Sequence, residues 1–82
     1  MTDILFLVER GIIGGDSQAE YVSASYEDAC RFVKKLMADG DGQVFYRDGN
    51  LDFWSDNQHF KEYSCFIGIV RFENGHHAGQ TQ

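Results

Sequence analysis

Cysteine and histidine are the residues of this chain that could bind a metal ion or carry a nucleophile, and there are two and three of them. A structural zinc site draws its ligands from closely spaced pairs such as C-x-x-C or H-x-x-x-H. Cys30, Cys65 and His59 lie far apart, and the adjacent His76 and His77 stand alone near the end of the chain. We therefore expect no metal site and no cofactor, and we expect both cysteines to be reduced and buried.

The sequence also contains no clear set of catalytic residues. Cys65 lies between Ser64 and Phe66 in an apolar segment, where burial would raise the pKa of its thiol and suppress its reactivity. Hydrolysis by paired carboxylates needs a cleft, for which a small chain has little room. The glycine-rich segment 11–16 is typical of a turn, because a phosphate-binding loop precedes a helix and Asp16 would repel the anion. We expect a protein that is not an enzyme.

Charge and hydropathy exclude two further classes. The chain has 13 acidic and 7 basic side chains and a net charge of -6, the opposite of what a nucleic-acid-binding surface requires. Its longest apolar run, Ile4–Val8, is far shorter than the roughly 20 residues that cross a membrane. We expect a cytoplasmic protein that binds neither nucleic acid nor membrane directly.

The elements that would position any site begin with a hairpin and a helix. The run Ile4–Val8 has the length of a strand buried on both sides, and Gln18–Ser23 reads as its partner across the glycine-rich turn. Ser25 is a typical helix N-cap, and Asp28 completes a weaker capping box. Apolar residues then recur at helical spacing, at Ala29, Phe32, Val33, Leu36 and Met37. Gly40 and Gly42 are expected to supply the left-handed stop.

An Asp48-Gly49 pair predicts a second hairpin with a two-residue turn. In that register Tyr46 faces Leu51 and Val44 faces Phe53, and we expect these four side chains in the core. The other side of the ribbon would then hold Gln43, Phe45, Arg47, Asn50, Asp52 and Trp54.

A final strand, Tyr63–Phe72, is apolar on both faces and should lie centrally beside Ile4–Val8. The order β-β-α-β-β-β predicts one α+β domain over residues 1–73. It would have two layers, an antiparallel-rich sheet with one amphipathic helix packed on one face. The segment 74–82 lacks periodic apolar residues and is expected to be disordered.

Aromatic residues make up 15% of the chain, more than one helix on a small sheet would cover. Exposed Trp and Phe beside Asp are typical of interface hot spots. The predicted partner contacts are Phe45, Asp48, Asp52 and Trp54, with Glu20, Asp56 and Glu62 as rim charges. Replacing Trp54 with Ala would then weaken binding by about 2 kcal/mol or more and leave the fold intact.

These features favour a small acidic protein-interaction module whose partner has a basic surface. A concrete version is an inhibitor or adaptor that occupies a nucleic-acid-binding surface, as phage anti-defence (anti-CRISPR or anti-restriction) proteins do. That analogy is one of size and charge only. The alternative is a self-associating structural or regulatory domain that forms a homodimer, and a small ligand-binding domain or enzyme is a third hypothesis.

Overall fold

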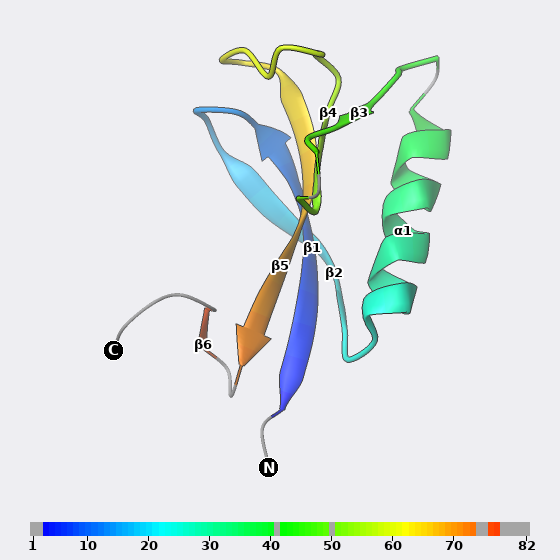
Figure 1. Ribbon diagram of the computed structural model, residues 1–82, viewed down its shortest axis with the longest axis vertical. Coiled ribbons are helices and arrows are strands. Elements are labelled where there is room, and N and C mark those ends of the chain that lie inside the picture. The colour runs from blue at the N-terminus through cyan, green and yellow to red at the C-terminus, as the bar shows by residue number, and fades with distance from the viewer. Residues whose placement is uncertain (1–2, 41, 50, 74–75, 78–82) are drawn as a thin grey trace.

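The sheet is built from strands that come from both ends of the chain (Figure 1). The computed structural model describes residues 3–40, 42–49, 51–73 and 76–77. Its elements are β1 (Ile4–Ile12), β2 (Ser17–Ser23), α1 (Tyr26–Asp39), β3 (Tyr46–Arg47), β4 (Phe53–Ser55), β5 (Cys65–Glu73) and β6 (His76–His77). The strand order is β2-β1-β5-β4-β3, with β6 beside β5, and each pairing is antiparallel. The predicted α+β class, one helix on an antiparallel sheet, is confirmed.

The two long strands β1 and β5 form the centre of the sheet. They pair without a break from Ile4 opposite Glu73 to Ile12 opposite Cys65. This confirms that the final strand lies beside the first, as its two apolar faces predicted. On the other side of β1, the pairing with β2 shifts at a β-bulge that leaves Glu20 unpaired.

The turn between β1 and β2 requires glycine at two positions. Gly14 has φ +78°, in the left-handed region that side chains rarely adopt. A Cβ on Gly11 would lie 2.3 Å from the carbonyl oxygen of Asp16, so no larger residue fits there. The segment is therefore a turn followed by a strand, as predicted.

Helix α1 begins where the sequence predicted. The Ser25 side chain accepts a hydrogen bond from the Asp28 N–H at 3.3 Å, which satisfies one of the free donors of the first turn. At the other end the Gly40 N–H donates to the Met37 carbonyl at 3.3 Å. Gly40 itself has φ -80°, so of the two glycines expected to be left-handed only Gly42, with φ +77°, is.

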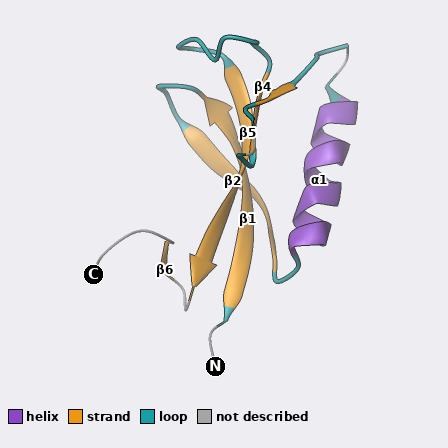
Figure 2. Ribbon diagram, in the orientation of Figure 1, coloured by secondary structure: helices purple, strands orange, loops and turns teal. Residues whose placement is uncertain are grey.

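The helix covers one side of the sheet, and the core lies between the two layers (Figure 2). Val8, Ala29, Val33 and Ile67 are each at most 1% exposed. Partly buried apolar and aromatic side chains from both layers surround them, namely Phe6, Tyr21, Phe32, Leu36, Met37, Phe45, Trp54 and Ile69. Among the described residues, the sheet and helix therefore share a hydrophobic core on the helix-covered side of the sheet.

The β3–β4 hairpin differs from the prediction in its register. Tyr46 pairs with Ser55, whereas a two-residue turn would place it opposite Leu51. The Asp48 N–H donates to the Phe53 carbonyl at 2.9 Å, so the loop comprises residues 49–52 rather than Asp48 and Gly49. Because the register moves by an even number of residues, the same side chains still share a face.

The assignment of those two faces to core and surface was wrong. Phe45 and Trp54 pack against the core, while Val44, Tyr46 and Leu51 are 60%, 40% and 61% exposed. Trp54 is the cross-strand neighbour of Ile67, and cross-strand neighbours lie on the same side of a sheet. The pairing of β4 with β5 therefore places Trp54 on the side that faces α1. The sequence of the hairpin alone does not determine which of its two faces lies on that side.

The predicted tail falls mostly outside the described residues. Of the segment 74–82, the structure describes only His76 and His77, which pair as β6 with Phe72 and Glu73. The predicted disorder of the other positions lies outside the described residues.

Candidate functional site

The residues predicted to contact a partner do not form one surface. Phe45, Asp52 and Trp54 lie on the side of the sheet that α1 covers. Asp48 pairs through its backbone with Phe53 and therefore lies on the opposite side. The four residues chosen from the hairpin are thus divided between two faces.

The three predicted rim charges have separate roles. Glu20 forms an ion pair with Arg10 at 3.0 Å. Asp56 accepts from the Cys65 N–H at 3.0 Å and from the Gln43 side chain at 2.9 Å. Glu62 is exposed, with its side chain close to Gly14. These contacts hold loops and a strand edge together at separate places.

A cluster between α1 and the hairpin contains Tyr26, Arg47, Asp52 and Trp54. The Arg47 guanidinium lies over the indole ring of Trp54, 5.3 Å from its centroid, and pairs with Asp52 at 3.3 Å. The Tyr26 hydroxyl donates to the same carboxylate oxygen, Oδ1 of Asp52, at 2.5 Å. This hydrogen bond, followed by one with Cys30, raises the pKa of Tyr26 well above its ordinary value. The cluster fastens the hairpin to the helix.

The groove beside this cluster has a volume of about 340 Å³ and is lined by Tyr26, Cys30, Val33, Lys34, Met37, Arg47 and Trp54. That volume is at the lower end for small-molecule sites. Tyr26 and Arg47, two of its polar side chains, already bind Asp52. The hydrogen bond from Tyr26 to Asp52 therefore links α1 to the hairpin beside the groove.

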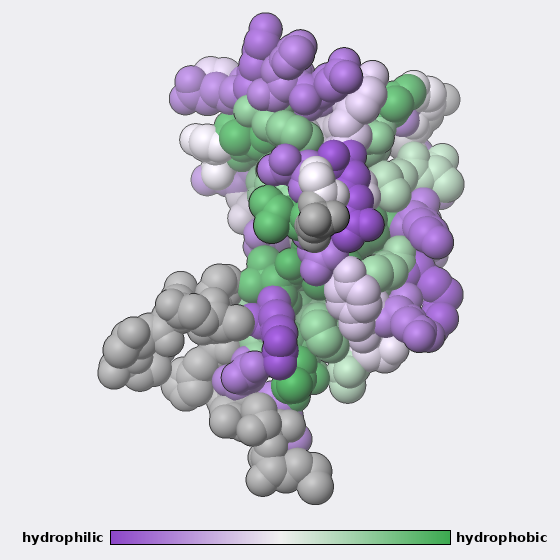
Figure 3. Space-filling model, viewed as in Figure 1, coloured by the Kyte–Doolittle hydropathy of each residue, from purple (hydrophilic) through white to green (hydrophobic). Residues whose placement is uncertain are grey.

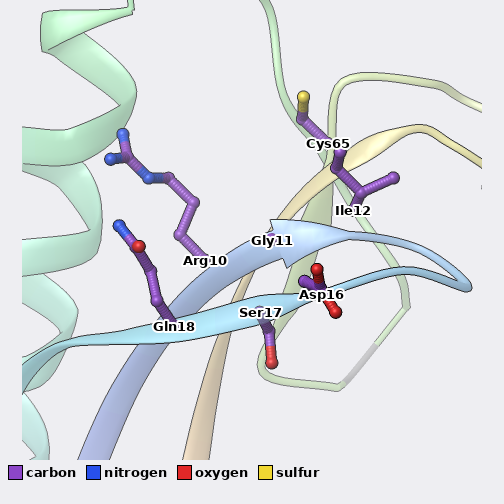
Figure 4. A pocket seen from close by; sticks show the side chains of 7 residues that line it. All are labelled: Arg10, Gly11, Ile12, Asp16, Ser17, Gln18 and Cys65. Atoms are coloured by element: carbon purple, nitrogen blue, oxygen red, sulfur yellow. The ribbon is translucent and has the colours of Figure 1, made fainter.

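A second, wide-open pocket of about 360 Å³ lies where β1 and β2 approach their turn (Figure 4). Arg10 and Gln18 point from these strands toward the helix, and both bind Glu20. Cys65 also lines the pocket, but its seven lining residues include no histidine that could act as a base. The pocket thus lacks the pair that a nucleophilic cysteine requires.

Cys30 and Cys65 are both free, and each is half-buried rather than fully buried. Within the described ranges, no group of His, Cys, Asp and Glu side chains is arranged to hold a metal ion. The one helix in the described part of the chain is not long and apolar enough to cross a membrane.

The side of the sheet opposite α1, hereafter the open face, is the remaining candidate. Its residues follow from the cross-strand pairings, because paired residues point to the same side. They are Leu5, Leu7, Glu9, Gly11, Ser17, Ala19, Val22, Tyr46, Asp48, Phe53, Ser55, Phe66, Gly68, Val70 and Phe72. No described helix packs on this face, but the loop before β5 covers part of it: Phe60 packs against Phe53, and Ser55 is buried.

The open face is apolar where β1, β2 and β5 meet. One cross-strand row contains Val22, Leu7 and Val70. Two residues away along β1, and therefore on the same face, Leu5 pairs with Phe72. Val22 is 53% exposed and Leu5 is 38% exposed. Hydrophobic side chains also reach the surface over the strands in the space-filling view, whereas hydrophilic ones dominate the loop end and the outer side of α1 (Figure 3).

Both charged residues of the open face, Glu9 and Asp48, are acidic. No Lys or Arg is among the strand residues that form this face. Arg10, Arg47 and Arg71 belong to the helix-covered side, Arg31, Lys34 and Lys35 to α1, and Lys61 to the loop before β5. The open face thus holds two carboxylates and no cation, whereas each strand arginine on the other side is paired with a carboxylate, Arg10 with Glu20, Arg47 with Asp52 and Arg71 with Glu73.

The sequence prediction missed Glu9 and Val22 as surface residues. A signal was present, because Glu9 follows directly on the apolar run Ile4–Val8 and marks one side of that strand as partly exposed. Asp48 was identified, but together with residues of the opposite face.

No family model, curated protein or solved structure matches the chain. Function is therefore inferred from the geometry and charge of the open face.

Proposed function

We propose that this protein is a non-enzymatic interaction module whose open face occupies a basic surface on a partner protein. The observation that carries the proposal is the composition of that face: exposed apolar side chains together with carboxylates and no cation. The partner surface that fits best is one that otherwise binds nucleic acid, because such a surface presents Lys and Arg side chains over a large contact area.

The apolar rows supply the expected contact centre. Protein interfaces have an apolar core and a polar rim, and a few central side chains carry most of the binding free energy. Val22, Leu7 and Val70 lie in one row of a rigid sheet, so a partner contacts them without first ordering a loop.

The charges determine which kind of partner fits. A net charge of -6 attracts basic surfaces over long range and speeds their encounter. At contact, Glu9 and Asp48 favour cations on the partner.

Self-association through this face is disfavoured by the same charges. A two-fold dimer would place the open face of one copy on the same patch of another. Carboxylates would then meet an apolar and acidic surface, and like charges across an interface are repulsive.

A matched pair of variants tests the proposal. Val22→Lys places a cation on the open face, and Ala38→Lys places the same charge on the exposed side of α1. The partner is first identified by affinity capture from the native cells and then purified. Calorimetry should show that Val22→Lys weakens its binding by about tenfold or more and that Ala38→Lys changes it by less than about twofold.

Two further measurements accompany this pair. Duplex DNA or RNA should compete with the protein for the partner, and added salt should weaken the complex. Equal losses from Val22→Lys and Ala38→Lys, or a complex with the chain's own copies as the sole partner, would overturn the proposal.

A further inference from the structure

One row of the open face combines carboxylates with aromatic rings. It crosses β2, β1, β5 and β4 and ends at the residue after β3, and it reads Ala19, Glu9, Gly68, Phe53 and Asp48. Neighbouring strands lie about 4.8 Å apart, so Glu9 and Asp48 are separated by roughly 14 Å of backbone. The two carboxylates flank the centre of the row from opposite sides.

The centre of the row is covered by two phenyl rings. Phe53 and Phe66 are stacked, with centroids 5.2 Å apart and an interplanar angle of 15°. A Cβ on Gly68 would lie 3.8 Å from the Phe66 ring and 3.9 Å from the Phe53 ring. The two rings therefore stack close over the glycine, and the Phe60 ring packs against Phe53 at 63° with centroids 5.7 Å apart, which makes an aromatic cluster of three rings between Glu9 and Asp48.

On the helix-covered side of the same hairpin, an arginine of the chain itself contacts an aromatic ring and a carboxylate. There the Arg47 guanidinium lies over the Trp54 ring and pairs with Asp52, so one cation contacts both a ring and a carboxylate. On the open face the strands supply rings and carboxylates, and no Lys or Arg is among the strand residues that form it. Within the described part of the chain, the side chains of Glu9 and Asp48 form no ion pair.

We infer that the aromatic cluster of Phe53, Phe60 and Phe66, with Glu9 and Asp48 beside it, binds an arginine side chain of the partner. This inference rests on the proposed function and specifies the chemical group that the open face recognises. The guanidinium packs against a ring of this cluster and donates hydrogen bonds to a neighbouring carboxylate.

Arginine fits this site better than lysine. A guanidinium is planar, stacks on aromatic rings and presents paired N–H donors to a carboxylate. An ammonium is a compact and strongly hydrated charge, which loses more hydration when it is placed against phenyl rings. The site should therefore discriminate between two peptides of equal charge.

The experiment compares a short arginine peptide with a lysine peptide of the same length, both with blocked ends. Each is titrated into isotopically labelled protein, and the amide shifts are followed by NMR. The arginine peptide should shift the amides of Gly68, Phe53 and Glu9 and should bind about threefold or more tightly than the lysine peptide.

Glu9→Gln and Glu27→Gln form a matched pair, since each removes one negative charge from a glutamate. Glu27 lies exposed in the first turn of α1, away from the open face. Glu9→Gln should weaken the arginine peptide by about threefold or more, and Glu27→Gln should leave it nearly unchanged. Phe66→Leu, which keeps an apolar cover over Gly68, should remove most of the preference for arginine.

Equal affinity for the two peptides, equal effects of the two glutamine variants, or shifts confined to the loops or α1 would overturn the inference. The purified partner separates this failure from that of the proposed function. If Val22→Lys abolishes its binding while Glu9→Gln and Phe66→Leu do not weaken it, the arginine site is wrong and the interaction face stands. If Val22→Lys has no effect, the proposed function itself is wrong.

Discussion

Trp54 packs against the hydrophobic core and lies beneath the guanidinium of Arg47. Its position against the core differs from the surface position that the sequence predicted. We now expect Trp54→Ala to destabilise the fold by about 2–4 kcal/mol, because it removes a large, partly buried ring and leaves a cavity below α1. Urea denaturation measures this loss directly.

Leu51→Ala is the control for that variant. Leu51 lies in the same hairpin and is 61% exposed, so its truncation should change stability by less than about 0.5 kcal/mol. A folded, fully stable Trp54→Ala protein would contradict the burial of this side chain and restore Trp54 as a surface anchor.

Asp28 makes part of the stability dependent on pH. The Tyr21 hydroxyl donates to its carboxylate at 2.5 Å, and this bond, followed by one with Ser23, lowers the pKa of Asp28 below its ordinary value of 3.8. A carboxyl whose pKa is lower in the folded chain stabilises folding while it is ionised. That contribution is present above the ordinary pKa and is lost as the pH falls through the lower, folded value.

Tyr21→Phe should therefore flatten the acid limb of the stability profile. The phenyl ring keeps the stacking on Phe32, whose centroid is 4.4 Å away, but donates no hydrogen bond. The free energy of unfolding should fall less steeply than in the parent protein between about pH 5 and about pH 2. Tyr46→Phe, at an exposed tyrosine, should follow the parent profile, and a Tyr21→Phe profile that does the same would refute the role of this bond.

At the scale of elements, Tyr26 links α1 to the β3–β4 hairpin. Its hydroxyl donates to Asp52, which also pairs with Arg47 from the hairpin. Tyr26→Phe should lower the free energy of unfolding by about 1 kcal/mol, the usual net value of one such hydrogen bond. It should also speed hydrogen exchange in the hairpin more than in β1 or β5.

Tyr63→Phe is the matched control, since Tyr63 is 76% exposed in the loop before β5. It should leave both stability and exchange unchanged. If the two variants behave alike, the link between helix and hairpin contributes nothing measurable.

The elements themselves could be predicted from local signals. The apolar run at Ile4–Val8, the cap at Ser25 and the helical spacing of Ala29 and Val33 each carry their own physical cause, and each element formed where expected. The hairpin was located but misregistered, because the Asp48-Gly49 signal describes a turn in isolation. The pairing of Trp54 with Ile67 on β5, a long-range contact, decides which way that hairpin faces.

At the scale of the whole molecule, the two sides of the sheet differ in charge and cover. One side holds the core, α1 and all strand arginines, and the open face holds exposed apolar rows with Glu9 and Asp48. Composition predicted an acidic surface but could not place it, because the face of each charge depends on strand register across the whole sheet. The acidic character of the candidate surface could thus be predicted from the sequence, but the residues that form it could not.

Residue-specific photo-cross-linking tests the central claim most directly. A photoreactive amino acid is placed at Val22 on the open face or at Ala38 on the outer side of α1, in the cells that express the protein. We predict that Val22 cross-links to a different protein, at a Lys- or Arg-rich surface, and that Ala38 does not. Cross-links to the chain's own copies alone, or a partner captured from Ala38 and not from Val22, would contradict the account.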